Sequence, residues 1–228
     1  MAILLDTDWG GPFYDAISFE YCSRKDAEPL ERYKQECEQR LRELDFQRFK
    51  EKKHPFEMRW VEYPRWADHV PNRIRLTKGV ALPDYVHDSG FGMLASETLK
   101  GLIEDVEPPG AGFSLFPIDV YLPDNSLYQE QYYVWDVFRK VDAIDPSSKG
   151  VKSVGGPVDG HHSWTYTAGG VKRTRETLAV KRDVIAGMAA WNDIRMSNGG
   201  CFIADALFNK MQFHALTGFS PRSEWSEV

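Results

Sequence analysis

Two adjacent histidines, His161 and His162, follow the turn-forming pair Asp159-Gly160. Imidazole and carboxylate groups are ligands that zinc prefers, so this cluster is the first place to look for metal chemistry. Neighbouring residues of an extended chain point to opposite sides, which leaves Asp159 and His161 as a pair that could share one ion. A zinc site uses three or four ligands, and we therefore expect no metal here.

A thiol offers a second kind of chemistry. Cys201 could act as a nucleophile if a histidine took its proton, and His214 follows in the same segment. The apolar run around Cys201 favours a buried, unreactive thiol instead. A hydrolase that uses Asp159, His161, Cys201 and His214 remains an alternative, but the sequence contains no P-loop, G-x-S-x-G, H-E-x-x-H or paired-cysteine zinc motif. The residues therefore favour a protein that is not an enzyme.

A glycine pattern raises a third possibility. Residues 90–95 read Gly-Phe-Gly-Met-Leu-Ala and match G-x-G-x-x-A, the pattern of dinucleotide-binding turns. That turn needs an apolar strand directly before it, whereas residues 84–89 read Asp-Tyr-Val-His-Asp-Ser. We expect an ordinary glycine-rich loop and no cofactor.

The bulk composition indicates a globular protein. A chain of 228 residues that is 42% hydrophobic can form one large domain or two small ones. It contains no apolar run near the ~20 residues of a membrane-spanning helix. The N-terminus, MAILLDTDWGG, lacks the basic region of a signal peptide, so we expect a cytoplasmic location. Three widely spaced cysteines are typical of reduced thiols and not of a disulfide framework.

The net charge of −6 is distributed unevenly. Between Asp84 and Asp145 there are 12 acidic and 3 basic residues. Such a segment would repel a phosphate backbone, which disfavours direct nucleic-acid binding, and it could steer a basic protein partner. An ordinary solvated surface is the alternative interpretation.

The longest helix is predicted from residue spacing. One helical face carries the apolar residues, and Pro29 suits the first helical position because its N–H would be unpaired there anyway. The helix should run for roughly 20 residues, end before His54-Pro55 and pack across a sheet; a partner-binding helix is the alternative. The residues of its apolar face are Leu30, Tyr33, Cys37, Leu41 and Leu44.

Runs of β-branched and aromatic residues predict strands, and the serine-, glycine- and proline-rich stretch Pro146–Gly160 predicts a mobile surface loop. The expected strands are Ala2–Leu5, Phe56–Glu62, Phe113–Leu122, Tyr132–Ala143, Ser163–Thr167, Thr177–Val180 and Ala189–Met196.

One stretch of the chain occurs twice. Leu94–Pro117 aligns with Phe202–Pro221, so that Leu94 lies opposite Phe202, 108 positions later, and a Gly-Phe-Ser is shared after a two-residue gap. Self-similarity of this kind predicts a duplicated helix–strand unit.

The ends of the two repeated helices are predicted from capping residues. Ser96 should cap the first helix, whereas Ala204 stands at the equivalent position of the second, and Asp205 is the expected cap there. Gly112 and Gly218 should terminate the two helices.

Together these elements predict an α+β fold with a mostly antiparallel sheet, a duplicated helix–strand unit and one long N-terminal amphipathic helix. We expect residues 1–228 to form one domain. A small N-terminal lobe, residues 1–83, beside a core of residues 84–228 is the alternative.

Four motifs resemble a known family. They are Leu-Ala-Ser-Glu-Thr-Leu at 94–99, Gly-Phe-Ser-Leu-Phe-Pro at 112–117, Tyr-Tyr-Val-Trp-Asp-Val at 132–137 with its continuation to Asp145, and Leu-Thr-Gly-Phe-Ser-Pro at 216–221. Over Leu82–Pro221 the chain resembles immunity protein family eleven of the bacterial polymorphic toxin systems. The resemblance implies a non-enzymatic antitoxin that binds a cognate toxin delivered by contact-dependent or type VI secretion.

A toxin-binding protein should use exposed aromatic residues in loops and their acidic neighbours, because tight interfaces concentrate in a few aromatic and arginine anchors. The candidates are Trp66, Asp84, Tyr85, Asp88, Asp124, Tyr128, Asp136 and Trp164. An acidic interface would suit a basic toxin such as a nuclease. A structural adaptor of a secretion apparatus is the remaining alternative.

Overall fold

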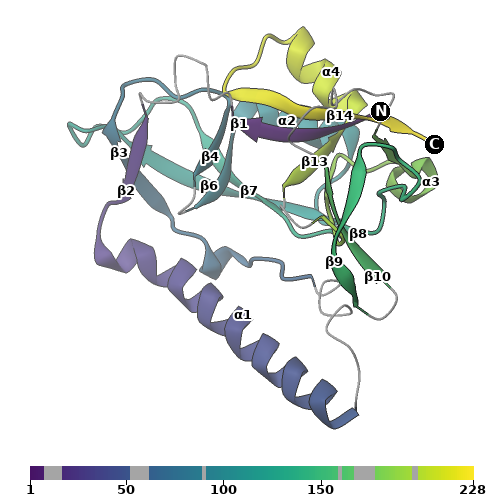
Figure 1. Ribbon diagram of the computed structural model, residues 1–228. Helices are drawn as coiled ribbons and strands as arrows, with labels where there is room; N and C mark the ends of the chain where they lie inside the picture. Colours follow the sequence, from purple (N-terminus) through teal and green to yellow (C-terminus); the bar gives the residue numbers. More distant parts are fainter. Residues whose placement is uncertain (8–16, 52–61, 89–90, 159–160, 167–177, 197–199) are drawn as a thin grey trace.

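The computed structural model describes residues 1–7, 17–51, 62–88, 91–158, 161–166, 178–196 and 200–228 (Figure 1). Within these ranges the chain forms two six-stranded sheets and a separate two-stranded hairpin, with helices that do not alternate regularly with the strands. Most neighbouring strands are antiparallel. The α+β class predicted from the sequence is confirmed.

The first sheet has the strand order β2-β3-β6-β7-β5-β4. Helix α2 (Glu97–Val106) connects β5 to β6, and β7 pairs antiparallel with both of these strands and so lies between them. The strands are β2 (Ser18–Tyr21), β3 (Arg73–Lys78), β4 (Tyr85–Asp88), β5 (Gly92–Ser96), β6 (Phe113–Tyr121) and β7 (Tyr132–Val137).

The second sheet has the order β11-β14-β1-β13-β12-β8. Helix α4 (Asp205–Phe213) connects β13 to β14, and β1 lies between these strands. A short helix, α3 (Arg182–Ile185), lies between β11 and β12 in the chain. The strands are β1 (Ala2–Thr7), β8 (Lys140–Val141), β11 (Ala179–Val180), β12 (Ala190–Asp193), β13 (Cys201–Ala204) and β14 (Phe219–Glu227).

The two sheets repeat one pattern. The order β3-β6-β7-β5-β4 corresponds to β11-β14-β1-β13-β12: in both, the first pair is parallel and the other three pairs are antiparallel. Each contains a β-α-β connection that is split by an antiparallel strand. We call β3–β7 with α2 the first unit, and β11–β14 with α4 and β1 the second unit. The duplication is confirmed and is larger than the aligned residues indicated, and the N-terminal strand completes the second copy.

The two units share one core. Helices α2 and α4 contact each other, and their apolar faces pack among side chains from both sheets. Alternation along the strands decides which side chains enter this core. In β7, Trp135 and Val137 face it, while Tyr132 and Val134 pack on the other side of the first sheet, as the alternation predicts. The buried helix residues are Leu99, Leu102, Ile103, Leu207, Phe208 and Met211.

The two repeated helices begin differently. Ser96 caps α2 by accepting the Leu99 N–H at 3.2 Å, as predicted. The prediction that Asp205 caps α4 is wrong: Asp205 is the first helical residue, and Ala204 stands before it without a side-chain cap. Instead, the Asp205 N–H donates to the Met1 carbonyl at 2.9 Å. Met1 thus satisfies the first N–H of α4, whereas the Leu207 N–H, the counterpart of the Leu99 N–H, receives no side-chain cap.

The prediction that Gly112 and Gly218 terminate the helices is wrong. α2 ends at Val106 and α4 at Phe213, several residues before each glycine. A Cβ at Gly112 would clash with the Arg139 guanidinium, and one at Gly218, where φ is +90°, would clash with the Tyr85 carbonyl. Close approach of other groups, and not helix capping, requires glycine at these positions.

Most predicted strands are confirmed, among them Phe113–Leu122 as β6. The strand expected over Tyr132–Ala143 is interrupted after Val137, because the N–H groups of Phe138 and Arg139 both donate to the Gly112 carbonyl. The residues expected to form the strand Phe56–Glu62 lie outside the described residues except for Glu62, which is not in a strand.

The stretch Pro146–Gly160 is not the loop that its composition predicts. It contains β9 (Val151–Val158), which pairs antiparallel with β10 (His161–Tyr166) to form the hairpin. The glycine pattern at 90–95 also belongs to a strand, since β5 begins at Gly92, whereas Gly90 lies outside the described residues. Cross-strand pairing outweighs the local preference of glycine for loops in both cases.

Strands from the N-terminal part of the chain are integral to both sheets. β1 pairs with β13 and β14, and β3 pairs with β6. These pairings support our proposal that residues 1–228 form one domain and not a separate lobe of residues 1–83.

Candidate functional site

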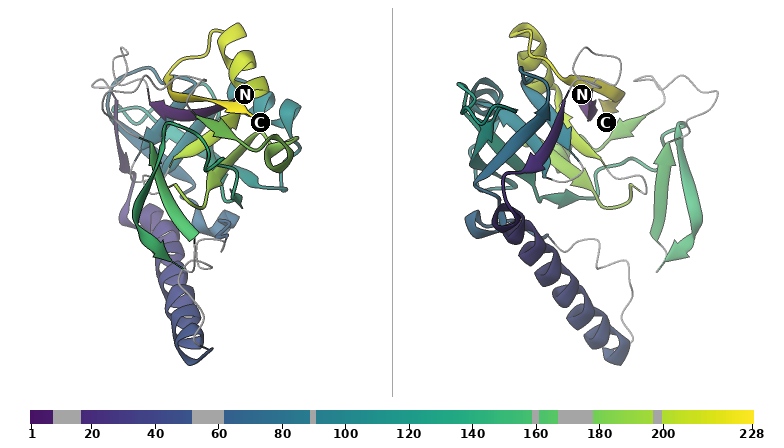
Figure 2. Two further views of the ribbon diagram at one scale, coloured as in Figure 1. Left: turned by 45° about the vertical axis from the view of Figure 1, so that its right-hand side comes forward. Right: turned by 90° about the vertical axis from the view of Figure 1, so that its left-hand side faces the viewer.

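Helix α1 (Arg24–Glu51) projects from the body of the molecule as an arm (Figures 1 and 2). Leu30, near its start, is buried, but between residues 31 and 43 only Tyr33, Cys37 and Leu41 are even half-buried. The predicted apolar face therefore exists up to Leu41, and the side chain of Leu44 lies outside the described residues. The expectation that this helix packs across a sheet is wrong.

The helix also begins earlier than predicted. Its first residue is Arg24, so Pro29 lies inside the helix. The Asp26 N–H donates to the Ser23 carbonyl at 3.0 Å, and the Ser23 hydroxyl donates to the Asp26 carboxylate at 2.6 Å. Serine is a preferred residue at helix starts, and this local turn outweighs the proline signal. The end at Glu51, before His54, agrees with the prediction.

Residues 62–69 lie against the half-buried stripe of α1 and end in the short helix η2 (Ala67–His69). The Tyr33 hydroxyl donates to the Tyr63 carbonyl at 2.7 Å. The Arg65 guanidinium lies 5.3 Å from the centre of the Tyr33 ring, and the His69 ring lies 5.4 Å from it. Burial raises the pKa of Tyr33, so its hydroxyl stays neutral and acts as a donor. Tyr33 thus fastens the arm to this segment.

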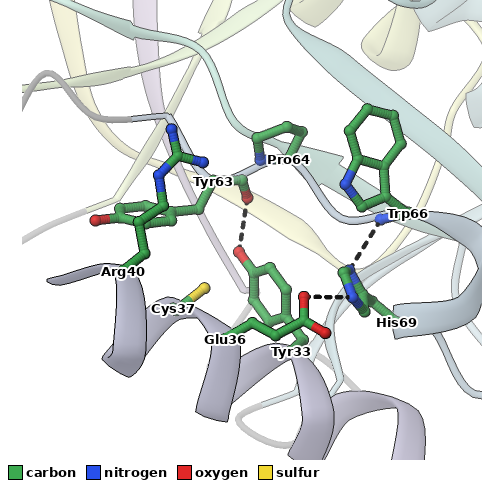
Figure 3. A pocket seen from close by; sticks show the side chains of 8 residues that line it. All are labelled: Tyr33, Glu36, Cys37, Arg40, Tyr63, Pro64, Trp66 and His69. Carbon is green, nitrogen blue, oxygen red and sulfur yellow. Dashed lines mark hydrogen bonds and ion pairs between the residues drawn. The ribbon is translucent and has the colours of Figure 1, made fainter. Parts of the chain in front are cut away.

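A pocket of about 140 Å³ opens between the arm and this segment (Figure 3). Small-molecule sites usually enclose ~300–1,000 Å³, so this pocket suits one side chain of a protein partner better than a cofactor. Its lining residues are Tyr33, Glu36, Cys37 and Arg40 from α1 and Tyr63, Pro64, Trp66 and His69 from the segment.

His69 holds the backbone of Trp66 in place. It is 5% exposed; its Nε2 lies 3.0 Å from the Glu36 carboxylate, and its Nδ1 accepts the Trp66 N–H at 3.3 Å. These partners assign the proton of the neutral ring to Nε2. The Trp66 side chain itself is 64% exposed. A large exposed aromatic on a fixed backbone loses little conformational entropy when it binds a partner.

Arg65 ties the segment to the first sheet. Its N–H donates to the Asp136 carboxylate at 2.9 Å, and its Nη1 donates to the Phe91 carbonyl at 2.7 Å. Its Nε lies 3.6 Å from the second oxygen of Asp136. Burial raises the pKa of Asp136, and the Arg65 N–H and guanidinium act against that rise. Asp136 in β7 therefore supports the segment from beneath.

Two cations flank Tyr63. The Arg40 Cζ lies 5.6 Å and the Lys140 Nζ 5.4 Å from the centre of the ring, both within the range of cation–π attraction. Lys140 belongs to β8, so the second sheet also reaches this site, and its backbone N–H donates to the Glu62 carboxylate at 3.3 Å. Burial lowers the pKa of Lys140.

A family model described as Immunity protein family (Imm11) matches residues 19–224. The chain belongs to the Imm11 immunity protein family. The match includes α1 and residues 62–69, which the motifs within Leu82–Pro221 did not reach. No curated protein matches the chain. Among the described residues of this Imm11 protein, no helix is long and apolar enough to cross a membrane.

Of the eight residues expected to contact a toxin, Trp66 and Asp136 belong to this site, Trp66 at the surface and Asp136 below it. Tyr85 is 2% exposed in the shared core, where burial raises its pKa. Asp84 accepts hydrogen bonds from the Ser96 hydroxyl at 2.8 Å and the Thr217 N–H at 2.9 Å. Asp84 and Tyr85 therefore hold the two units together in this Imm11 protein.

Asp124, Tyr128 and Trp164 do not line the pocket beside Trp66. Asp124 is exposed in a turn, where hydrogen bonds from Ser126 lower its pKa. Trp164 is half-buried in β10, and its ring stacks on His162 at 5.6 Å. Asp88 lies in β4, and its side chain lies outside the described residues.

Tyr128 is half-buried, and its hydroxyl accepts the Leu82 N–H at 3.1 Å. It lines a second pocket of about 110 Å³ together with Asp119, Leu127 and Glu130. The carboxylates of Asp119 and Glu130 beside this pocket are exposed.

Several carboxylates of the acidic segment pair with cations within the protein. Glu107 pairs with Arg139, and Asp142 with Arg195 and Lys181. Asp105 pairs with Lys210, and Glu104 with Lys100. Several of these basic residues come from outside residues 84–145, so counting charges along the sequence overstates the acidity of the surface.

Of the residues considered for catalysis, the structure describes the side chains of Cys201 and His214. Cys201 is 9% exposed, and burial raises the pKa of its thiol to about 12, which opposes thiolate formation at neutral pH. His214 is exposed at the end of α4. Asp159 and the side chain of His161 lie outside the described residues. No group of three or more potential metal ligands occurs among the residues that the structure describes.

Sequence reasoning missed most of the site. Tyr33 and Cys37 were assigned to core packing, and Tyr63, His69 and Lys140 were not singled out. The aromatic residues in 60–66 and the arginines of the helix were visible signals, but their meeting depends on how residues 62–69 return along α1.

Proposed function

We propose that this Imm11 protein is a non-catalytic antitoxin that binds a cognate secreted bacterial toxin and neutralises it. Membership of the immunity protein family carries the proposal. We propose that the two proteins meet in the cytoplasm of the cell that makes both, where contact-dependent or type VI delivery from kin would also bring the toxin.

The arm and residues 62–69 support a binding function. They present an exposed tryptophan beside a pocket of side-chain size, and buried groups fix the surrounding backbone. Binding energy in protein interfaces concentrates in such aromatic and arginine anchors. We therefore propose this surface as the toxin-binding site.

The chemistry of the candidate nucleophile supports a non-catalytic role. A buried thiol whose pKa is raised to about 12 is a poor nucleophile, and the pocket at the arm is lined by groups already engaged with one another. Inhibition by binding requires only a rigid complementary surface.

Co-expression with the product of the adjacent gene tests the proposal. In a host that lacks both genes, we expect the neighbouring product alone to stop growth and this protein to restore it, with the two proteins purifying as a stoichiometric complex. A neighbour that is harmless, or that stays toxic in the presence of this protein, would refute the proposal.

Two variants separate binding from catalysis. If the protein acted as a hydrolase through its histidines, His161→Ala or His214→Ala would abolish protection. We expect both variants to protect fully. Purification with a secretion apparatus, and not with one toxin, would indicate a structural adaptor instead.

A further inference from the structure

Two cations of the arm site differ from the arginines around them. Arg32, Arg42 and Arg65 each have a carboxylate partner within 4 Å. Arg40 and Lys140 have none among the described residues, although both lie over the Tyr63 ring. Two positive charges beside one ring repel each other and remain available to an anion.

Glu36 lines the pocket beside Arg40, and its carboxylate lies against His69. Glu62 attracts Lys140, since its charge acts to raise the Lys140 pKa, but it forms no ion pair with it. It accepts the backbone N–H of Lys140 at 3.3 Å and does not lie within 4 Å of the ammonium group. An incoming carboxylate would therefore find Lys140 partly desolvated and Arg40 exposed, with donors that can bind its oxygens.

Trp66 supplies the apolar half of the same surface. It borders the pocket that Arg40 and Tyr63 also line. Phe213 is more exposed, at 86%, but it stands at the end of α4, where its ring contacts His214. Scattered exposed apolar residues are ordinary, whereas an aromatic residue beside a pocket and two unpaired cations forms a combined site.

We infer that the arm surface of α1, residues 62–69 and Lys140 receives a segment of the cognate toxin that carries a carboxylate side chain next to an apolar one. The carboxylate binds between Arg40 and Lys140, and the apolar side chain packs against Trp66 in the pocket. This inference rests on the proposed function and adds the chemistry of the partner. It is opposite in sign to the basic toxin expected from the acidic segment.

The affinity of purified variants for the product of the adjacent gene tests this inference. We expect Trp66→Ala to weaken binding by about 30-fold or more, the effect of losing an interface anchor. Arg40→Glu should weaken it by about 10-fold or more, mainly through slower association, and should reduce the dependence of affinity on salt. Arg40→Gln should fall between Arg40→Glu and the wild type.

Matched controls lie on the same molecule. Arg42→Glu makes the same change in charge two residues along the helix, on the opposite face, where Arg42 is 82% exposed and pairs with Glu38. Phe213→Ala removes a more exposed aromatic residue elsewhere. Both should bind within about 3-fold of the wild type. Thermal unfolding of every variant confirms that the fold is retained.

The outcomes are distinguishable. If the wild type binds and both Trp66→Ala and Arg40→Glu lose affinity, the inference is supported. If the wild type binds but Arg40→Glu binds equally tightly or more tightly, the inference is wrong and the antitoxin proposal still stands. Loss in Glu130→Lys alone, beside the second pocket, would likewise overturn it in favour of a basic toxin surface. Failure of the wild type to bind or protect removes the proposed function and this inference with it.

Discussion

The two β-α-β units have the same strand order and polarity and equivalent backbone contacts before their helices, but they differ in the elements that are added to them. In the first unit the Ser96 N–H donates to the Asp84 carbonyl, and in the second the Ala204 N–H donates to the Ala189 carbonyl. Carboxylates of the first unit also accept backbone N–H groups of the second unit. The Asp84 carboxylate accepts the Thr217 N–H, and the Glu107 carboxylate accepts the Ala189 N–H.

The additions to each unit are unrelated. The first unit is preceded by β2, α1 and residues 62–69, whereas the second carries β8, α3 and the β9–β10 hairpin. Figures 1 and 2 show the arm and the hairpin on the same side of the molecule. The repeated parts therefore provide the scaffold, and we propose that the parts that differ provide partner recognition.

Breaking the buried link between the units should have the largest effect on stability. Glu107 is 5% exposed, pairs with Arg139 and accepts the Ala189 N–H at 2.6 Å. Glu107→Ala leaves a buried guanidinium and a buried N–H without their partner, which we expect to lower the free energy of unfolding by about 3–5 kcal/mol. Urea denaturation measures it.

Glu104→Ala is the control for this change. Glu104 pairs with Lys100 on the surface of α2, and its loss should cost about 0.5 kcal/mol or less. Equal effects of the two variants would show that the link between the units is unimportant.

Alanine substitutions at two glycines should have the second-largest effect on stability, and they test how closely the two units approach each other. Gly110 and Gly218 both have positive φ, but a Cβ at Gly110 meets open space and one at Gly218 meets the Tyr85 carbonyl. Gly110→Ala should cost about 1–2 kcal/mol from backbone strain alone. Gly218→Ala should cost about 3 kcal/mol or more, because the second unit must move away from β4. Thermal denaturation that ranks them in the reverse order would contradict the proposed close approach.

Exchanging the helix caps tests the equivalence of the units. Ser96→Ala removes the cap of α2 and should lower the free energy of unfolding by about 1 kcal/mol. Ala204→Ser introduces the same cap at α4, opposite the Leu207 N–H, and should raise stability by about 0.5–1 kcal/mol. Chemical denaturation of both variants is the measurement. Destabilisation by Ala204→Ser would mean that the Met1 carbonyl leaves no room for the hydroxyl.

The smallest expected effect is a difference in titration between the arm and the core. Burial raises the pKa of Asp193, although the N–H groups of Arg195, Ile144 and Ala143 act against it. Burial also acts to raise the pKa of Asp26 at the base of the arm, but hydrogen bonds from Arg73 and Ser23 outweigh it, and the net pKa is lowered.

The two shifts have opposite consequences for stability. As the pH falls from neutral, Asp193 protonates first and makes the folded state more stable relative to the unfolded one. Asp26 contributes stability above its ordinary pKa and loses it as the pH falls through the lowered value. Carboxyl chemical shifts should show Asp193 titrating above Asp26, and the reverse order would contradict these environments.

Local sequence signals accounted for much of the scaffold. Ser96 caps α2 because a serine before a helical pattern acts through hydrogen bonds only three residues away. Alternation along Tyr132–Val137 gave the two faces of β7 correctly, because pleating fixes the direction of successive side chains. The spacing of 108 revealed the repeated helices, since equivalent packing needs equivalent residues.

The site depended on contacts that no local pattern encodes. Tyr33 has helical spacing and was assigned to a core, but it meets Tyr63 because residues 62–69 return along the arm. Tyr85 and Asp84 looked like loop residues available to a partner, but the second unit covers them. The carboxylates of residues 84–145 were expected at a charged surface. Arg195, Lys181 and Lys210, which lie outside this segment, pair with two of them.

The sequence by itself determined the fold class, the duplicated unit, the long helix and the family resemblance, because these follow from propensity, periodicity and recurring motifs over short distances. Tertiary structure decided that β1 completes the second unit, that α1 stands as an arm, and that Arg40 and Lys140 lie over one ring without an ion-pair partner among the described residues. Charge pairing and burial depend on distances between residues far apart in the chain, and only the folded arrangement sets those distances.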